Sequence, residues 1–200
     1  MTGVQTCALP ICIVSAALKL FYDQGIKSVG VDAVAETAGV TKRTLYYHFK
    51  SKDDLVAAYL EARDQPNLAQ FKRWFDGAPG DLADKTESIY TNLARAARHP
   101  KWKGCGFLRT AAELANMPGH PAIVIGRAHK RKFEEWMRQS FEGAGLTGAT
   151  TLARQIVLLL DGAFATVLLN RDPSYFETAG QAARVLVAAA QSRGPSEGTI

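Results

Sequence analysis

Apolar residues recur along most of this chain at intervals of three and four positions, the spacing that places them on one face of a helix. No segment alternates apolar and polar residues with the two-residue period of a strand. Glycines, prolines and capping residues divide the pattern, and the first helical segment runs from Ile13 to Gly25. Further helices are expected at residues 31–38, 42–49, 51–75, 82–98, 107–116, 121–143, 149–170 and 174–192. The pattern therefore predicts an all-α fold, with an interruption or kink at Pro66.

Two short segments, 31–38 and 42–49, form a helix-turn-helix pattern. Gly39 suits the sharp turn between them because it has no side chain to clash there. Thr41 can cap the second helix, and Leu45 is expected to hold that helix against the core. A single helix fits the major groove of DNA, where its exposed side chains can reach base edges and phosphates. The pattern therefore favours DNA binding.

Charge is unevenly distributed around this motif. The chain has a net charge of +5 from 24 basic and 19 acidic residues. Between Thr41 and Lys52 there is no acidic residue, whereas the same stretch holds four cations and a histidine: Lys42, Arg43, Lys50, Lys52 and His48. An unneutralised basic segment beside two tyrosines suits DNA phosphates, although a solvated helix face is the commoner role of such a segment.

Other classes of protein fit the sequence poorly. The longest apolar block, residues 156–169, is interrupted by Asp161 and Gly162, so a buried helix is expected and no membrane partner. The three cysteines have no paired spacing, which argues against a disulfide scaffold or a metal site and favours the cytoplasm. The phosphate-binding glycine loop, the zinc-protease motif and the nucleophile elbow are missing from the sequence. We therefore expect no enzyme activity, no catalytic residues and no cofactor.

The stretch from Ile13 to Leu55 resembles the DNA-binding domain of the tetracycline-repressor (TetR) family of transcriptional regulators. The matching pieces are IVSAALKLFYDQG and VDAVAETAGVTKRTLYYHFKSKDDL. The resemblance implies an all-α homodimer that carries two helix-turn-helix heads over a ligand-binding body, and it implies duplex operator DNA as a partner. Position by position, the residues that it assigns to DNA contacts are Thr41, Lys42, Arg43, Thr44, Tyr46, Tyr47, His48 and Lys52. Tyr46 has an alternative role in packing.

The domain boundaries expected from these observations are a head at residues 13–50, a connecting helix at 51–75 and an effector-binding and dimerisation domain at 81–193. Residues 194–200 form a tail. Residues 1–12, MTGVQTCALPIC, resemble a translated sequencing adapter and lack the basic residues that usually precede the first helix in the family. They are therefore expected to be non-native or disordered.

The last two predicted helices have the composition of an interface. The segment 149–170 is apolar nearly all round, and the segment 174–192 carries a stripe of small residues. Pairing both helices with their copies gives a four-helix interface, which the family resemblance also implies. The alternative is that both helices fill the core of a monomer.

An effector pocket is expected where polar groups interrupt apolar and aromatic stretches. The candidate lining residues are Tyr90, Phe107, Glu113, Met117, His129, Phe133, Trp136, Met137, Asp161 and Phe164. Each polar member is individually more often a hydrogen-bonded core group than a ligand contact. Together they favour a small hydrophobic or aromatic effector. With the family resemblance, we expect a repressor that such an effector releases from a palindromic operator. The alternative is a small-molecule-binding or scaffolding dimer whose DNA-binding head is degenerate.

Overall fold

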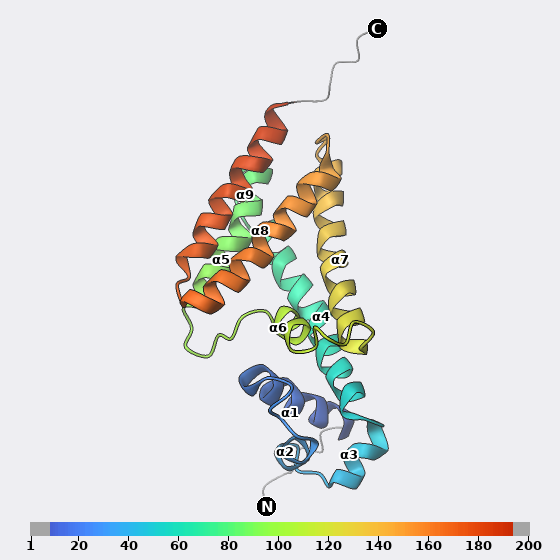
Figure 1. Ribbon diagram of the computed structural model, residues 1–200. Coiled ribbons are helices and arrows are strands. Elements are labelled where there is room, and N and C mark those ends of the chain that lie inside the picture. Colours follow the sequence, from blue (N-terminus) through green and yellow to red (C-terminus); the bar gives the residue numbers. More distant parts are fainter. Residues whose placement is uncertain (1–8, 194–200) are drawn as a thin grey trace, which may run out of the picture. The chain divides into compact units, whose positions relative to one another are not determined.

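The computed structural model describes residues 9–193, and over this range the chain is built of α-helices without strands (Figure 1). The predicted all-α fold is confirmed. In chain order the helices are α1 (Leu9–Gln24), α2 (Val31–Thr37), α3 (Lys42–His48), α4 (Lys52–Asp76), α5 (Leu82–Ala97), α6 (Gly106–Glu113), α7 (Pro121–Gly143), α8 (Ala149–Asn170) and α9 (Ser174–Ser192).

The last three helices have the predicted bounds, and the departures lie nearer the N-terminus. Helix α1 begins at Leu9, so residues 9–12 are helical, and their expected non-native origin stays a prediction. Proline is tolerated in the first turn of a helix, where Pro10 lies, because the N–H that it lacks would have no partner there. Helix α4 continues through Pro66, so of the two predicted effects of this proline the interruption is wrong and the kink stays a prediction. Residues 1–8 and the predicted tail 194–200 lie outside the described residues.

The two cysteines among the described residues differ in their state. Cys12 takes part in a disulfide, whereas Cys105 is a free thiol. Cys7 lies outside the described residues. A bond at Cys12 does not amount to the disulfide scaffold that the sequence argued against.

The helices group into two compact units. Of the described residues, 9–65 and 105–127 form the first unit, and 66–104 and 128–193 form the second. This division differs from the predicted domains, because residues 105–127 belong with the helix-turn-helix segment rather than with the body. Helices α4 and α7 each contribute residues to both units.

The core of the first unit fixes the helix-turn-helix segment to α1 and α4. Buried apolar residues of α1, α2, α3 and α4 form one cluster, in which Ile13, Val34, Leu45 and Leu55 are fully buried. Gly25 ends α1 with a φ of +88°, a conformation that glycine adopts without strain, which confirms its predicted capping role. The two short helices α2 and α3 are therefore held by the unit's core rather than by their own length.

The second unit is centred on α5, α8 and α9. The hydroxyl of the buried Tyr90 on α5 donates a hydrogen bond of 2.8 Å to the carbonyl oxygen of Ile156 on α8. A Cβ atom at Gly180 of α9 would lie only 2.8 Å from the Cβ of Tyr90, so glycine permits the close approach of α5 and α9. Helix α8 is the one described helix that is long and apolar enough to cross a membrane, a property that core helices of soluble proteins share.

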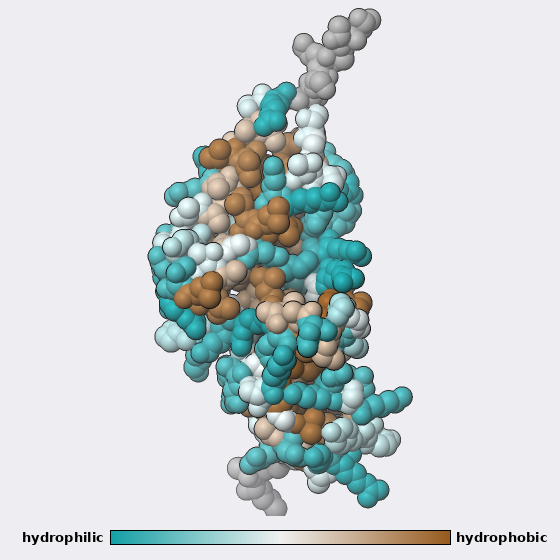
Figure 2. All heavy atoms as spheres, in the orientation of Figure 1, coloured by the Kyte–Doolittle hydropathy of each residue, from teal (hydrophilic) through white to brown (hydrophobic). Residues whose placement is uncertain are grey.

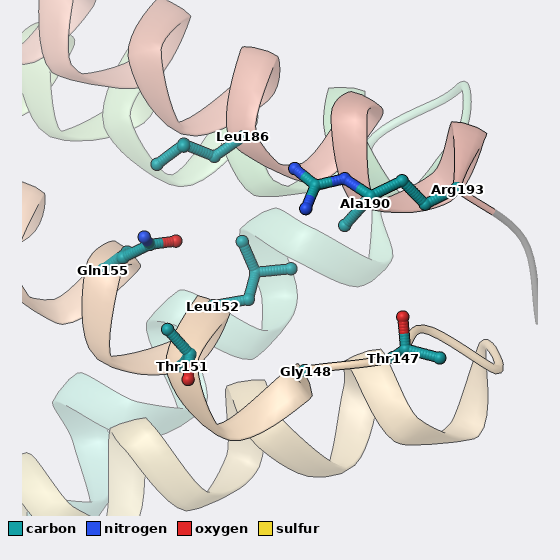
Figure 3. Close-up of a pocket in the computed structure, with 8 residues that line it drawn as sticks. All are labelled: Thr147, Gly148, Thr151, Leu152, Gln155, Leu186, Ala190 and Arg193. Carbon is teal, nitrogen blue, oxygen red and sulfur yellow. The ribbon is translucent and has the colours of Figure 1, made fainter. Parts of the chain in front are cut away.

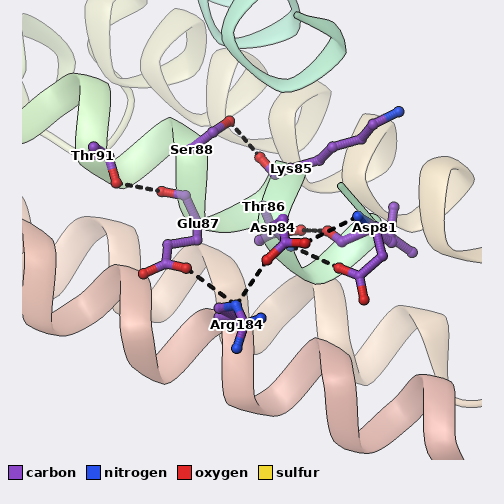
Figure 4. A network of polar contacts seen from close by, with 9 residues as sticks. Asp81, Asp84, Lys85, Thr86, Glu87, Ser88, Thr91 and Arg184 are labelled. Carbon is purple, nitrogen blue, oxygen red and sulfur yellow. Dashed lines mark hydrogen bonds and ion pairs between the residues drawn. The ribbon is translucent and has the colours of Figure 1, made fainter. Parts of the chain in front are cut away.

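A polar network links α5 and α9 along their exposed edge (Figure 4). Arg184 of α9 lies 2.9 Å from Asp84 and 3.4 Å from Glu87, both on α5. Asp81 and Asp84 form a reciprocal capping box at the start of α5. The Arg184 guanidinium and the backbone N–H of Asp81 hold the pKa of Asp84 below its usual value. The network therefore orients the two helices at the surface.

Candidate nucleic-acid interface

The start of α3 is set by local chemistry that the sequence predicted. Thr41 is the N-cap residue, and its Oγ1 accepts a hydrogen bond of 3.1 Å from the backbone N–H of Thr44. Gly39 adopts a φ of +68° in the turn before it, and the N–H of Val40 donates 2.9 Å to the carbonyl oxygen of Ala35. Leu45, which is fully buried, then fixes the rotation of α3 about its own axis.

With Leu45 facing the core, the polar and aromatic side chains of α3 face solvent. Tyr47 is 85% exposed and Tyr46 is 42% exposed. The ring of Tyr47 packs edge-on against the ring of His48, with 5.1 Å between the centroids. Five of the eight predicted contact residues share one shallow hollow on this face: Arg43, Thr44, Tyr46, Tyr47 and His48. The structure therefore brings most of the predicted set together on one surface.

The cations of this region differ in what they already bind. The Nζ atom of Lys42 forms an ion pair of 3.1 Å with Asp32 on α2, and both side chains are largely exposed. Within the described part of the chain, neither Arg43 nor Lys52 forms an ion pair. An exposed pair such as Lys42–Asp32 contributes little to stability and can be exchanged for a phosphate contact. Among the predicted contact residues, Arg43 and Lys52 are thus the cations most readily available to DNA.

Lys52 begins α4, and a histidine that the sequence reasoning missed holds this first turn in place. The Nε2 atom of His120 lies 3.2 Å from Oδ1 of Asp53, and the histidine side chain is 3% exposed. Its Nδ1 atom accepts a hydrogen bond of 3.1 Å from the backbone N–H of Ala122. Since Nδ1 is an acceptor, Nε2 carries the hydrogen and donates it to Asp53. His120 therefore caps the start of α7 and ties it to the first turn of α4.

Comparison with known proteins assigns the segment that carries α3 to a family. The family model described as "Bacterial regulatory proteins, tetR family" matches residues 13–59. The solved structure of a TetR-family transcriptional regulator from Streptomyces coelicolor is 30% identical in sequence and has a TM-score of 0.79. The match covers 91% of this chain and 95% of that one. The chain belongs to the TetR family.

Further relatives agree with this assignment. A TetR regulator from Streptomyces avermitilis is 27% identical, has a TM-score of 0.79, and matches over 92% of this chain and 99% of its own. The transcriptional regulator AcuR of Cereibacter sphaeroides is 31% identical over 134 residues, which are 64% of this chain and 57% of AcuR. The family consists of transcriptional regulators with a helix-turn-helix DNA-binding domain, not of enzymes.

The predicted effector-pocket residues of this TetR-family chain do not all lie in one unit. Three of them belong to the unit that carries α3. Phe107 is part of its apolar core, and the Glu113 carboxylate accepts a hydrogen bond of 2.8 Å from the backbone N–H of Lys27. Met117 is 45% exposed.

The other seven candidates lie in the second unit, mostly in packed aromatic surroundings. On α7, His129, Phe133 and Met137 are buried. The ring of Trp136 contacts the rings of Phe133 and Phe75 at centroid distances of 5.6 and 5.3 Å. Two further contacts complete the set: Asp161 pairs with Lys130, and Phe164 packs against Trp102 and Phe176. Tyr90 bonds to α8 as described above. The effector pocket stays a prediction.

The hollows found in the second unit involve different residues. One, of about 230 Å³, lies between the start of α8 and the end of α9 (Figure 3). Its lining residues are Thr147, Gly148, Thr151, Leu152, Gln155, Leu186, Ala190 and Arg193. Another, of about 290 Å³, is a groove between α8 and α9 that includes Leu158 and Tyr175. Sequence periodicity marks these positions as helix faces but does not indicate which faces leave a groove between them.

Proposed function

We propose that this TetR-family regulator acts in the cytoplasm as a homodimer that binds a pseudo-palindromic operator in duplex DNA. In this proposal it represses transcription, and a small hydrophobic or aromatic effector releases it. The observation that carries the proposal is the solvent-facing surface of α3, with Arg43, Tyr46, Tyr47 and His48 on one side and Leu45 anchored on the other. A helix mounted in this way can enter the major groove without distortion of its own core.

Seven of the eight predicted contacts have a clear chemical role in this arrangement. Arg43 presents a guanidinium fork that matches the O6 and N7 acceptors of guanine. The exposed hydroxyls of Tyr46 and Tyr47 and the ammonium group of Lys52 suit phosphate oxygens. Lys42 reaches a phosphate by exchanging its contact with Asp32. Thr41 and Thr44 hold the helix start, whose positive end also favours a phosphate.

Apolar surface on α8 and α9 supports the homodimer. Leu158 and Leu169 of α8 are 71% and 81% exposed, and Val185 of α9 is 65% exposed. Figure 2 shows apolar side chains at the surface over these two helices. Exposed apolar side chains on two neighbouring helices are typical of an interaction site, and a second copy of the same face would cover them with two-fold symmetry. Two-fold symmetry also suits two operator half-sites.

The effector proposal rests on the aromatic cluster of the second unit, in which α7 places Phe133 and Trp136 beside Phe75. An effector that opens this cluster would bind one conformation of the dimer better than another. If that conformation spaces the two α3 helices differently from the DNA-bound state, linkage requires that the effector lowers DNA affinity and that DNA lowers effector affinity by the same factor.

Selection of bound sequences from a random duplex pool tests the proposal. The full-length protein should enrich an inverted repeat whose half-sites lie about one DNA turn apart, near 34–36 Å, or at another spacing that the groove allows. Enrichment of no sequence, together with an affinity that does not respond to salt, would favour the scaffolding dimer with a degenerate head.

A further inference from the structure

The helix-turn-helix segment, residues 31–49, consists of two helices of seven residues each, which are too short to be stable alone. Contacts at its two ends therefore help to fix its position. Before it, residues 25–30 connect α1 to α2, and two of them, Ile26 and Val29, are buried in the core of the first unit. After it, α4 begins at Lys52. Both ends make polar contacts with α6 and the start of α7.

The contact before α2 comes from Glu113, the last residue of α6. Its carboxylate accepts a hydrogen bond of 2.8 Å from the backbone N–H of Lys27. A Cβ atom at Gly25 would lie only 3.0 Å from Oε1 of Glu113, so glycine lets the carboxylate lie directly against the chain. A hydrogen bond to an ionised acceptor is stronger than one to a neutral acceptor. Glu113 therefore holds the backbone just after α1.

Arg109, one turn earlier on α6, holds the end of α1 itself. Its guanidinium donates a hydrogen bond of 2.6 Å to the carbonyl oxygen of Tyr22, in the last turn of α1. The carbonyl oxygens of a last turn lack partners within the helix, and the negative end of the helix dipole favours a cation. Arg109 and Glu113 are four positions apart, so they lie on the same face of α6. That face therefore caps the end of α1.

The contact after α3 comes from His120, further along the same stretch of chain. Its Nε2 atom lies 3.2 Å from Oδ1 of Asp53 in the first turn of α4, and its Nδ1 atom accepts a hydrogen bond from the backbone N–H of Ala122. Residues 106–122, the bridge segment, thus contact the chain on both sides of the helix-turn-helix segment.

The bridge segment is itself fixed to the core of the first unit. Phe107, Leu114 and Ala122 belong to its buried apolar cluster. Between α6 and α7, the N–H of Met117 donates 2.8 Å to the carbonyl oxygen of Leu114, and the N–H of His120 donates 2.9 Å to that of Met117. Two consecutive turns therefore set the separation of Glu113 from His120 along the bridge.

We propose that Arg109 and Glu113 are positioning residues for DNA binding, because the bridge segment holds both ends of the helix-turn-helix segment at once. They act through the backbone at the end of α1, which sets where α2 and then α3 begin, and they do not contact DNA. Without these bonds the connection at residues 25–30 samples other conformations, and only the fraction in the binding conformation reads an operator. The role in operator recognition rests on the proposed function.

Glu113→Ala removes the acceptor and tests this role. It should bind the selected operator about tenfold more weakly, as expected if about a tenth of the molecules keep the binding conformation. Glu61→Ala is the matched control, because Glu61 is an exposed glutamate of α4 in the same unit. Both variants lose one negative charge, which favours DNA binding, so weaker binding by Glu113→Ala alone is not an effect of charge.

Fluorescence anisotropy with the operator and with a scrambled duplex separates positioning from stability. A variant that only unfolds more easily loses affinity for both duplexes by the same factor, because less folded protein is present. Loss of positioning should lower operator affinity more, since nonspecific binding rests on phosphate contacts that need no base register. Glu113→Gln keeps an oxygen that can accept from Lys27, so it should recover most of the operator affinity. Equal losses on both duplexes would overturn the proposal.

Hydrogen exchange of the full-length protein without DNA tests the bridge independently of the DNA-binding proposal. In Glu113→Ala, the amides of residues 25–37 should exchange about tenfold faster than in the wild type, whereas α5 of the second unit should be unchanged. Glu61→Ala should exchange like the wild type throughout. If Glu113→Ala does not fold, Arg109→Ala, which loses the bond to Tyr22, decides with the same readouts.

Unchanged exchange at residues 25–37 would overturn the proposal whether or not the protein binds DNA. Faster exchange together with wild-type operator affinity would show that the bridge serves stability alone, and it would also overturn the positioning role. A wild type that selects no operator would contradict the DNA-binding proposal instead, and the exchange data would still decide whether the bridge holds the helix-turn-helix segment.

Discussion

Arg43 and Lys52 carry the same charge, but their positions give them different tasks on DNA. Arg43 lies on the exposed face of α3, where it can read a base, and Lys52 lies at the start of α4, where it can bind a phosphate. Arg43→Ala should therefore relax the preference for one base in each half-site, at a cost of about 1–3 kcal/mol. The base preference of bound duplexes measures this change, and an unaltered profile would remove Arg43 from the base-reading set.

Lys52→Ala is the counterpart to that variant. Loss of a phosphate contact should weaken binding to all duplexes alike and should lower the slope of log affinity against log salt concentration by about 1. Fluorescence anisotropy with the selected operator and with a scrambled duplex, over a salt series, measures both quantities. A change in base preference without a change in slope would contradict the assignment of Lys52 to phosphate.

At the scale of elements, His120 makes two contacts with different roles: one caps α7, and the other supports the first turn of α4, where the DNA-binding residue Lys52 lies. The side chain bonds Ala122 at the start of α7 and Asp53 in the first turn of α4. His120→Ala should lose both bonds and lower the free energy of unfolding by about 1–3 kcal/mol. Asparagine is a good N-cap residue, so His120→Asn should keep the cap and lose only the longer contact with Asp53.

The asparagine variant should therefore retain most of the thermal stability and still bind DNA more weakly than the wild type, because Lys52 lies beside a first turn that is no longer tied to α7. Thermal melts and anisotropy titrations on the same samples measure the two effects. If His120→Asn bound DNA as tightly as the wild type, the contact with Asp53 would have no part in DNA binding.

The elements also indicate what could be predicted from the sequence. The caps at Gly25 and Thr41 and the turn at Gly39 follow from chemistry within a few residues, and the structure has each of them where the sequence predicted. The contact of His120 with Asp53 could not be predicted in this way, because it joins residues far apart in the chain. Sequence periodicity shows which face of a helix is buried but not which other residues cover that face. For the same reason Phe107 and Phe164 resembled each other as pocket candidates although they lie in different units. The spacing of the three cysteines gave no sign of the disulfide at Cys12.

For the whole molecule, the proposed dimer rests on the apolar faces of α8 and α9. Val185→Glu places a charge on a side chain that is 65% exposed in the single chain and would be buried between two copies. We expect this variant to sediment at the mass of one chain, whereas the wild type sediments at twice that mass. The matched control is Val124→Glu on α7, where the valine is 52% exposed and outside the proposed interface. A dimeric Val185→Glu would place the interface elsewhere.

The proposed effector response is also a property of the whole molecule. Helices α4 and α7 each run through both units, so either can transmit a change in the aromatic cluster to the segment that carries α3. With a coupling free energy of about 1–3 kcal/mol, the effector should change operator affinity by roughly five- to 150-fold. Trp136→Ala should reduce this response and leave effector-free DNA binding nearly intact. Loss of DNA binding and of folding in that variant would mean that Trp136 serves the core rather than a pocket.

The central claim is that a dimer of this TetR-family chain reads a specific duplex through α3. Analytical ultracentrifugation of the full-length protein with the selected operator, over a salt series, tests this claim most directly. The account predicts two chains on each duplex, an affinity that falls linearly on logarithmic axes as salt rises, and much weaker binding to a scrambled duplex. Equal binding to both duplexes, or a complex with a single chain, would contradict it.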